Sequence, residues 1–292
     1  MLDVEEIAER IYRLEAPVPG MPYVPVAYLI TESDGVLIEP GPSPAIPLIR
    51  EGMEHLGMND LAYIIPTHFH LDHAGGAGEL AQLFPRAKVV IHPRGAKHAL
   101  DPSQFIKSTK MVWGDDFETR FGPITPVRER QLQVPEDGEI INVDGRELEI
   151  IYAPGHAPHQ IVILDHKAEG LFCAEALGLP WHHMPAVAPP RFDLETYLET
   201  IEKLRLLDTR MLFVSHGGLE LEPEKIIARA AESAVVCRDI ILSDLKQGMN
   251  PEATRNSIAD YVTRSTGLQL TETDLLVIIG GYTMAFQSMG LV

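Results

Sequence analysis

Four side chains that can bind a metal ion lie within six positions, directly after an apolar run. The segment Thr67–Ala74 reads THFHLDHA and follows Leu61–Pro66. In an extended chain, residues i and i+2 lie on the same side, so His68 and His70 can converge on one ion. Asp72 and the adjacent His73 lie where the chain turns, which suits a second ion. Imidazole and carboxylate ligands favour zinc, iron or manganese over magnesium or calcium.

These side chains need a strand before them and a helix after them. Leu61–Pro66 has the length and apolar character of a buried strand, and Gly75-Gly76 opens a helical pattern that runs to about Phe84. Strands and helices alternate twice along the chain, and only helical patterns remain beyond Gly218. We therefore predict an α/β (α+β) fold: a four-layer αββα sandwich with an appended C-terminal helical region.

Periodicity and turn residues place the individual elements. The predicted strands are Ile11–Leu14, Val26–Thr31, Val36–Glu39, Leu61–Pro66, Lys88–Ile91, Ile140–Val143, Glu147–Tyr152, Ile161–Leu164, Leu171–Ala174 and Met211–Val214. The predicted helices are Ile46–Leu56, one from Pro93, Leu194–Leu207, Pro223–Gly248, Pro251–Thr266 and Thr271–Met289. Asp144-Gly145 is a strong hairpin signal, and the remainder of residues 93–135 is interpreted as an irregular covering insertion. We expect one domain over residues 1–222 and a helical region over residues 223–292 that packs on it.

The histidine-rich segment resembles the HxHxDH signature of the metallo-β-lactamase-fold superfamily, and all four ligand positions match. That family has a third histidine in a Pro-Gly-His turn after a strand, and here the matching residue is His156. It has a last histidine before glycine after a late strand, and here the matching residue is His216. The likeness covers about residues 10–220 in the same order and points to the glyoxalase II-like branch of metallohydrolases.

The resemblance implies a ligand set for two metal ions. His68, His70 and His156 would hold the first ion, and Asp72, His73 and His216 the second. The family usually has an aspartate that bridges both ions, but here Glu175 is the only carboxylate in register, so it is assigned that position. Glu39 likewise stands where an early strand commonly ends in aspartate. These two longer side chains leave the metal spacing, the metal identity and the reaction class open.

The resemblance also implies a reaction. Two divalent metal ions, zinc foremost with iron or manganese as alternatives, would lower the pKa of a shared water toward about 7. The resulting metal-bridging hydroxide would attack a thioester or ester of a small substrate, or a lactone, lactam or phosphodiester, and Asp72 would orient it. The alternative is a di-iron oxidoreductase or oxygen-binding protein on the same fold, which the carboxylate of Glu175 favours. His182 and His183 are expected on a loop that overhangs the site and contacts substrate.

Composition excludes several other functions. The 292 residues include 24 Lys+Arg and 42 Asp+Glu, a net charge of −18, which argues against nucleic acid and against a polybasic membrane surface as partners. Cys173 and Cys237 are too few for a disulfide scaffold. The sequence shows neither a signal peptide nor a membrane-spanning run, so we expect a cytoplasmic protein that acts on a small molecule. Apolar stripes on the C-terminal helices favour packing on the first domain or a homodimer.

Overall fold

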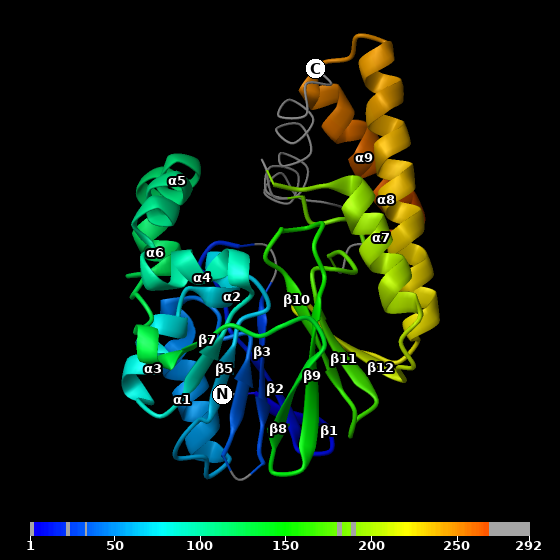
Figure 1. The fold of residues 1–292 in the computed structure, drawn as a ribbon. Coiled ribbons are helices and arrows are strands. Elements are labelled where there is room, and N and C mark those ends of the chain that lie inside the picture. Colours follow the sequence, from blue (N-terminus) through cyan, green and yellow to red (C-terminus); the bar gives the residue numbers. More distant parts are fainter. Residues whose placement is uncertain (1–2, 22–23, 33, 180–182, 188–190, 269–292) are drawn as a thin grey trace. The chain divides into compact units, whose positions relative to one another are not determined.

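The computed structural model describes residues 3–21, 24–32, 34–179, 183–187 and 191–268 (Figure 1). The chain divides into two compact units. Unit 1 comprises the described parts of Met1–Tyr152, His159–Ala174 and Met211–Leu219, and unit 2 those of Ala153–Pro158, Glu175–Arg210 and Glu220–Val292. The domain boundary expected at residue 222 stays a prediction.

Unit 1 contains a seven-stranded sheet whose strands follow each other in chain order. Its strands are β1 (Val4–Ala8), β2 (Ile11–Glu15), β3 (Val26–Ile30), β4 (Val36–Ile38), β5 (Tyr63–Ile65), β6 (Lys88–Val90) and β7 (Leu132–Gln133). Neighbours from β1 to β4 are antiparallel, and those from β4 to β7 are parallel. Parallel neighbours need crossover connections, and the helices of this unit supply them.

A second, six-stranded sheet has the order β13-β12-β11-β10-β9-β8. Its strands are β8 (Glu139–Val143), β9 (Arg146–Tyr152), β10 (Ile161–Asp165), β11 (Gly170–Ala174), β12 (Met211–Val214) and β13 (Gly218–Glu220). The predicted hairpin between β8 and β9 is confirmed, with Val143 opposite Arg146. Asp144 and Gly145 both adopt positive φ, 56° and 89°, as a tight hairpin turn requires.

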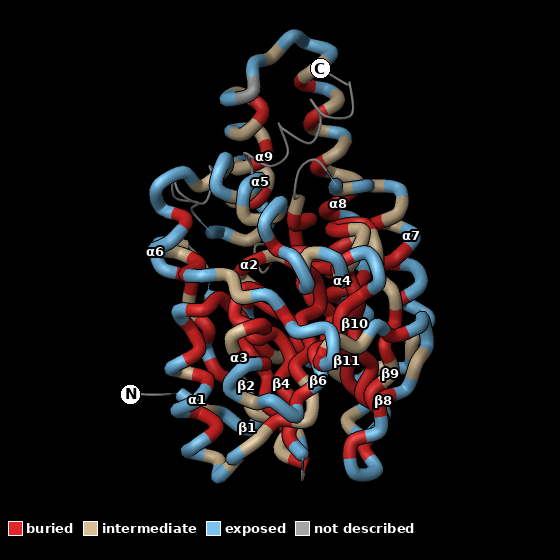
Figure 2. Tube along the Cα trace, turned by 60° about the vertical axis from the view of Figure 1, so that its left-hand side comes forward, coloured by how far each residue is buried: buried red, intermediate tan, exposed pale blue. Residues whose placement is uncertain are grey.

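Apolar side chains between and outside the sheets form separate cores. Ile38, Ile65, Ile150 and Phe172, from both sheets, belong to the same buried cluster, which is the core between the two layers. A second cluster joins the other face of the first sheet to α1 (Ile46–His55) and α3 (Ala77–Leu83), which cover that face (Figure 1). Strands β3, β4, β10 and β11 are accordingly buried along their whole length, and β4, β10 and β11 are labelled in Figure 2, whereas the edge strand β1 contains no buried residue.

The helix predicted from Pro93 is confirmed as α4 (Pro93–Leu100). The remainder of residues 93–135, interpreted as an irregular insertion, is largely helical, so that interpretation is wrong. It contains α5 (Ser103–Trp113) and α6 (Phe117–Phe121), besides short 3-10 turns at Gly114–Asp116 and Glu129–Gln131. The short helices mix polar and apolar residues. Burial of Phe117 and Phe121 in a small cluster stabilises them through tertiary packing that local periodicity does not reveal.

Unit 2 contains the three long helices α7 (Leu194–Arg205), α8 (Pro223–Lys246) and α9 (Pro251–Thr266). The Asp193 carboxylate accepts a hydrogen bond from the backbone N–H of Thr196, and the Asn250 side chain accepts one from Ala253, so α7 and α9 start at capped ends. Helices α8 and α9 share a buried apolar cluster that includes Cys237. The predicted helices here are confirmed, whereas Thr271–Met289 lies outside the described residues.

Three further differences concern short elements. The acidic segment Val4–Ala8 forms β1 by pairing with β2, and Gly218–Glu220 forms β13 where only helices were expected. The helix expected from Gly75 begins instead at Ala77, and a separate short helix α2 (Leu71–Ala74) precedes it. Among the described helices, none combines the length and the apolar character that a membrane span requires.

Candidate metal centre

In unit 1, the histidine-rich segment follows the parallel strand β5, bends at residues 67–69 and then turns into α2. His68 is buried, and its Nε2 lies 2.9 Å from Nδ1 of His70. Its other nitrogen, Nδ1, lies 3.0 Å from the hydroxyl of Thr67. The structure thus brings the two predicted ligands His68 and His70 together, although the chain that carries them is bent rather than extended.

The second predicted set also lies within unit 1, and it comes from two distant segments. Asp72 and His73 lie on α2, and His216 follows β12. Their ligand atoms all lie within 4.8 Å of one another. The Asp72 Oδ2 is 3.4 Å from Nε2 of His73 and 3.9 Å from Nε2 of His216. Two imidazoles and a carboxylate at this spacing can share one divalent ion.

The buried carboxylate of Glu39 orients the second set through hydrogen bonds. It is 3% exposed, follows β4 with a φ of 58°, and accepts a hydrogen bond from Nδ1 of His73 at 2.7 Å. The hydroxyls of Thr67 and Ser215, which directly precede the ligand-type residues His68 and His216, also donate to it. A carboxylate on the far nitrogen of a histidine fixes the ring's orientation and leaves the other nitrogen for a metal.

The same carboxylates alter the protonation of His73. Burial by itself lowers the pKa of this imidazole, but the negative charges of Glu39 and Asp72 outweigh it. The pKa therefore lies well above the ordinary value of 6.5. A site that stabilises an imidazolium so strongly is also one where a positive metal ion is electrostatically favoured.

A shell of rings surrounds the first part of the motif. The backbone N–H of Phe69 donates to Nδ1 of His159 at 3.3 Å, and the His159 ring is stacked at 6.3 Å from that of His68. Phe69 itself contacts Phe105 on α5 edge-on, with centroids 5.3 Å apart. Hence α5, from the segment that the sequence left irregular, supports the position between two predicted ligands.

In unit 2, the remaining two predicted ligands contact each other. His156 Nε2 lies 2.8 Å from Oε2 of Glu175, and both residues are buried. The other nitrogen of His156, Nδ1, lies 2.6 Å from the carbonyl oxygen of Ala186. A carbonyl only accepts, so Nδ1 carries the proton and donates it, which leaves Nε2 as the ligand atom. The assignment of Glu175 as a bridge between two ions stays a prediction.

The N-terminal part of α7 fixes the loop that carries His156. The Thr200 hydroxyl donates to the carbonyl of Pro154 at 2.6 Å, and the Asp193 N–H donates to that of Gly155 at 2.9 Å. Gly155 has a φ of 133°, and a Cβ there would lie only 2.4 Å from the Cα of Tyr197. The turn therefore requires glycine at this position.

Two other predictions fall on the following loop. His182 lies outside the described residues. His183 is buried, and its Nδ1 lies 3.2 Å from the carbonyl oxygen of Leu177.

Cys173, two residues before Glu175, is fully buried with its thiol 3.6 Å from the carbonyl oxygen of Phe213. This thiol is thus part of the packing of β11 against β12.

Apart from Glu39, the residues that support the predicted ligands are ones that the sequence did not reveal. Thr67 and Ser215 each stand directly before a predicted ligand, and this shared position is a signal that could have indicated their role. Thr200 and the carbonyl of Ala186 carry no such signal, because only the folded chain brings them to the His156 loop. The donors gathered in the two units are imidazole nitrogens and carboxylate oxygens, a set that fits zinc, iron or manganese.

Comparison with known families identifies the fold family. The model of the metallo-beta-lactamase superfamily matches residues 20–216. The chain belongs to this superfamily. The matched range includes the whole histidine-rich segment, both later histidines and Glu175, which is consistent with the ligand positions discussed above.

Several curated members of the superfamily are similar to the chain. A metallo-beta-lactamase fold-containing protein of Sulfurisphaera tokodaii is 29% identical over 56% of this chain and 62% of its own length. An atrochrysone carboxyl ACP thioesterase of Aspergillus fumigatus is 26% identical over 54% and 39%. The hydroxyacylglutathione hydrolase GloC of Haemophilus influenzae is 27% identical over 64% and 82%. The chain thus spans less than two thirds of the first two relatives.

A solved structure extends the likeness to nearly the whole chain. A metallo-beta-lactamase family protein of Thermus thermophilus superimposes with a TM-score of 0.73, at 18% identity, over 96% of this chain and 94% of that one. At this identity the likeness concerns the fold. It confirms the predicted αββα sandwich with appended C-terminal helices.

Proposed function

We propose that the protein is a metal-dependent hydrolase of the superfamily that cleaves a thioester or ester bond of a small substrate. The observation that carries the proposal is the convergence of Asp72, His73 and His216 in unit 1, with all ligand atoms within 4.8 Å and Glu39 behind them. The names of two relatives, a thioesterase and a hydroxyacylglutathione hydrolase, support the substrate class.

Two divalent ions, zinc foremost, are proposed as cofactors. His68, His70 and His156 would hold one ion and Asp72, His73 and His216 the other, with Glu175 as a further carboxylate ligand. When bound, such ions supply hydroxide at neutral pH and stabilise the negative charge that develops on a carbonyl oxygen. The fit rests on the donor chemistry of these side chains, of which all but His70 and Asp72 are buried.

The chain's own residues then have distinct tasks. Asp72 is the least buried ligand of its group, with a side chain 14% exposed, so its carboxylate can orient the attacking water and accept its proton. Glu39 keeps the His73 ring aligned through Nδ1, and the carbonyl of Ala186 does the same for His156. Fixed rings keep the ligand geometry from rearranging during the reaction.

The direct test is elemental analysis of the protein purified without added metal, together with a panel of thioester, ester, lactone and phosphodiester substrates. We expect about two zinc ions per chain and hydrolysis of the thioesters. H68A and D72A should each lose metal and activity. His166→Ala is the matched control, because this exposed histidine pairs with Glu149 at the surface. Full metal retention and activity in both ligand variants would contradict the proposal.

The same measurement separates the alternative function. A carboxylate such as Glu175 in the ligand set also suits iron. About two iron ions per chain, with an absorption band that changes on exposure to oxygen, would favour a di-iron oxidoreductase or oxygen-binding protein.

A further inference from the structure

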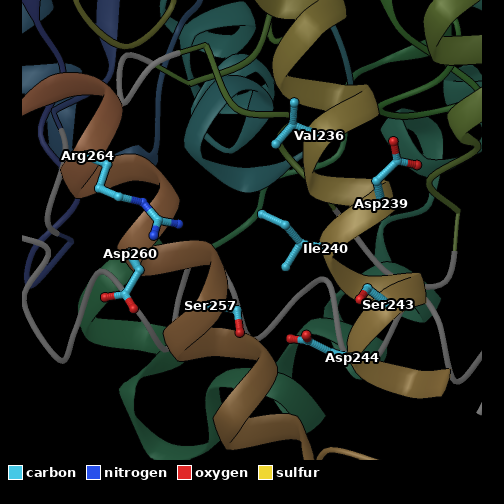
Figure 3. Close-up of a pocket in the computed structure, with 8 residues that line it drawn as sticks. All are labelled: Val236, Asp239, Ile240, Ser243, Asp244, Ser257, Asp260 and Arg264. Carbon is cyan, nitrogen blue, oxygen red and sulfur yellow. The ribbon is translucent and has the colours of Figure 1, made fainter. Parts of the chain in front are cut away.

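A second site candidate lies entirely within unit 2, in a cavity of about 490 Å³ between α8 and α9 (Figure 3). The lining side chains recur at three- and four-residue intervals, so they lie on one face of each helix. Val236, Asp239, Ile240, Ser243 and Asp244 come from α8, and Ser257, Asp260 and Arg264 from α9. A volume of this size accommodates a small molecule.

Asp244 is the feature that points to a ligand. Its side chain extends into the space between the helices (Figure 3), yet the residue is only 7% exposed. Its Oδ2 has no hydrogen-bond partner among the residues that the structure describes. A buried carboxylate oxygen without a donor raises the free energy of the folded state, because the oxygen has lost its hydrogen bonds to water. Such an atom is stabilised when a cationic donor enters the cavity.

The two hydroxyls beside Asp244 add acceptor capacity. The Ser257 hydroxyl already donates its proton to the carbonyl of Ala253, so its oxygen can only accept further hydrogen bonds. The Ser243 oxygen accepts from the side-chain amide of Gln247 and has a second lone pair. This end of the cavity therefore complements a group with several N–H donors, and a primary ammonium has three.

The opposite end has the reverse character. Arg264 lies two helical turns beyond Ser257 on α9, about 10 Å along the axis, and its guanidinium extends toward the gap between the helices (Figure 3). Val236 and Ile240 provide an apolar wall between the two ends. Asp239 and Asp260 are exposed residues of the rim, and Asp239 forms an ion pair with Arg238.

We propose that this cavity binds a small zwitterionic molecule with a primary ammonium at one end of an apolar chain and an anionic group at the other. The ammonium contacts Asp244 and Ser257, the chain lies on Ile240, and the anion meets Arg264. The proposal is independent of the metal centre, because the described residues that line the cavity all belong to α8 or α9.

The test uses the full-length protein and the probe 6-aminohexanoate, with hexylamine and hexanoate as half-ligands, in isothermal titration calorimetry. We expect saturable binding of 6-aminohexanoate and at least about tenfold weaker binding of either half-ligand. D244N and R264Q should each weaken the probe about tenfold. Glu232→Gln is the matched control and should stay within about twofold, because Glu232 is an exposed carboxylate of α8 that does not line the cavity. No saturable binding up to about 10 mM, or unchanged binding in D244N, would overturn the proposal.

The melting temperatures of the ligand-free variants provide a second test, which does not depend on binding. Removing the charge of this buried carboxylate, whose Oδ2 has no hydrogen-bond partner among the described residues, should raise the melting temperature of ligand-free D244N above that of the wild type. A lower melting temperature for D244N, with that of E232Q unchanged, would show that Asp244 has a structural role, and this would also overturn the proposal.

Discussion

His73 and His156 are both predicted ligands, yet the two units support them in different ways. In unit 1, the Nδ1 of His73 donates to the buried carboxylate of Glu39 at 2.7 Å. In unit 2, the Nδ1 of His156 donates to the backbone carbonyl of Ala186 at 2.6 Å. The first support is a charged side chain, and the second is the path of the main chain.

The difference determines what each support contributes besides orientation. Glu39 adds a negative charge, which helps to raise the pKa of His73 well above 6.5, and it also gathers two hydroxyls. The Ala186 carbonyl adds no charge, so the position of His156 depends on how tightly α7 and Gly155 shape its loop. One ligand is therefore sensitive to electrostatics and the other to backbone geometry.

The largest expected effect is that of Gly155→Ala. The Cβ of an alanine at this position would lie 2.4 Å from the Cα of Tyr197. The alanine would also have to adopt the native φ of 133°, which is strained for any residue with a side chain. We expect a loss of about 3 kcal/mol in the free energy of unfolding, measured by urea denaturation. Gly248→Ala is the control: its φ is 71°, but it has no atom within 4 Å of the added Cβ. Equal losses in both variants would show that the contact with α7 is unimportant.

For Glu39→Gln we expect a smaller loss of stability than for Gly155→Ala, together with a large loss of metal affinity. The amide keeps the size of the side chain but removes the charge that faces His73 and leaves one of three donors poorly matched. We expect a loss of about 2 kcal/mol and a metal affinity about 10–100-fold lower, measured by competition with a chromophoric chelator.

The matched control for this variant is Glu32→Gln, which removes another buried carboxylate. Glu32 bonds Arg10 at 2.8 Å and Arg146 at 3.3 Å, away from any predicted ligand. It should lose stability without a change in metal affinity, and Glu39→Asp should retain part of the affinity. If Glu32→Gln and Glu39→Gln lowered metal affinity equally, the special role of Glu39 would be refuted.

The smallest effect is expected for Thr200→Val, which keeps the shape of the side chain but removes the donor to Pro154. One hydrogen bond to a buried carbonyl contributes about 1 kcal/mol. Metal affinity should fall less than about tenfold, since the other loop contacts remain. Thr200→Ser should restore both quantities, and a valine variant with unchanged stability would remove α7 from the support of His156.

The accuracy of the sequence-based predictions follows the range of the interactions involved. The strands with apolar runs, such as β5 and β10, and the capped helix α9 were placed within one or two residues, because local patterns specify them. The edge strand β1 was missed, since its acidic residues become a strand only by pairing with β2. Helix α5 was missed because it depends on ring contacts such as Phe105 with Phe69.

The sequence by itself determined the chemistry of the candidate site: four donor residues in six positions, two later histidines at turns, and the family to which the pattern belongs. The spacing of donors along a strand is a local property, so it can be read without a fold. Only the tertiary structure decided how each ligand is held. Glu39 meets Thr67, His73 and Ser215 across 28, 34 and 176 positions of the chain. Partners so distant are chosen by sheet packing and burial, which local sequence does not encode.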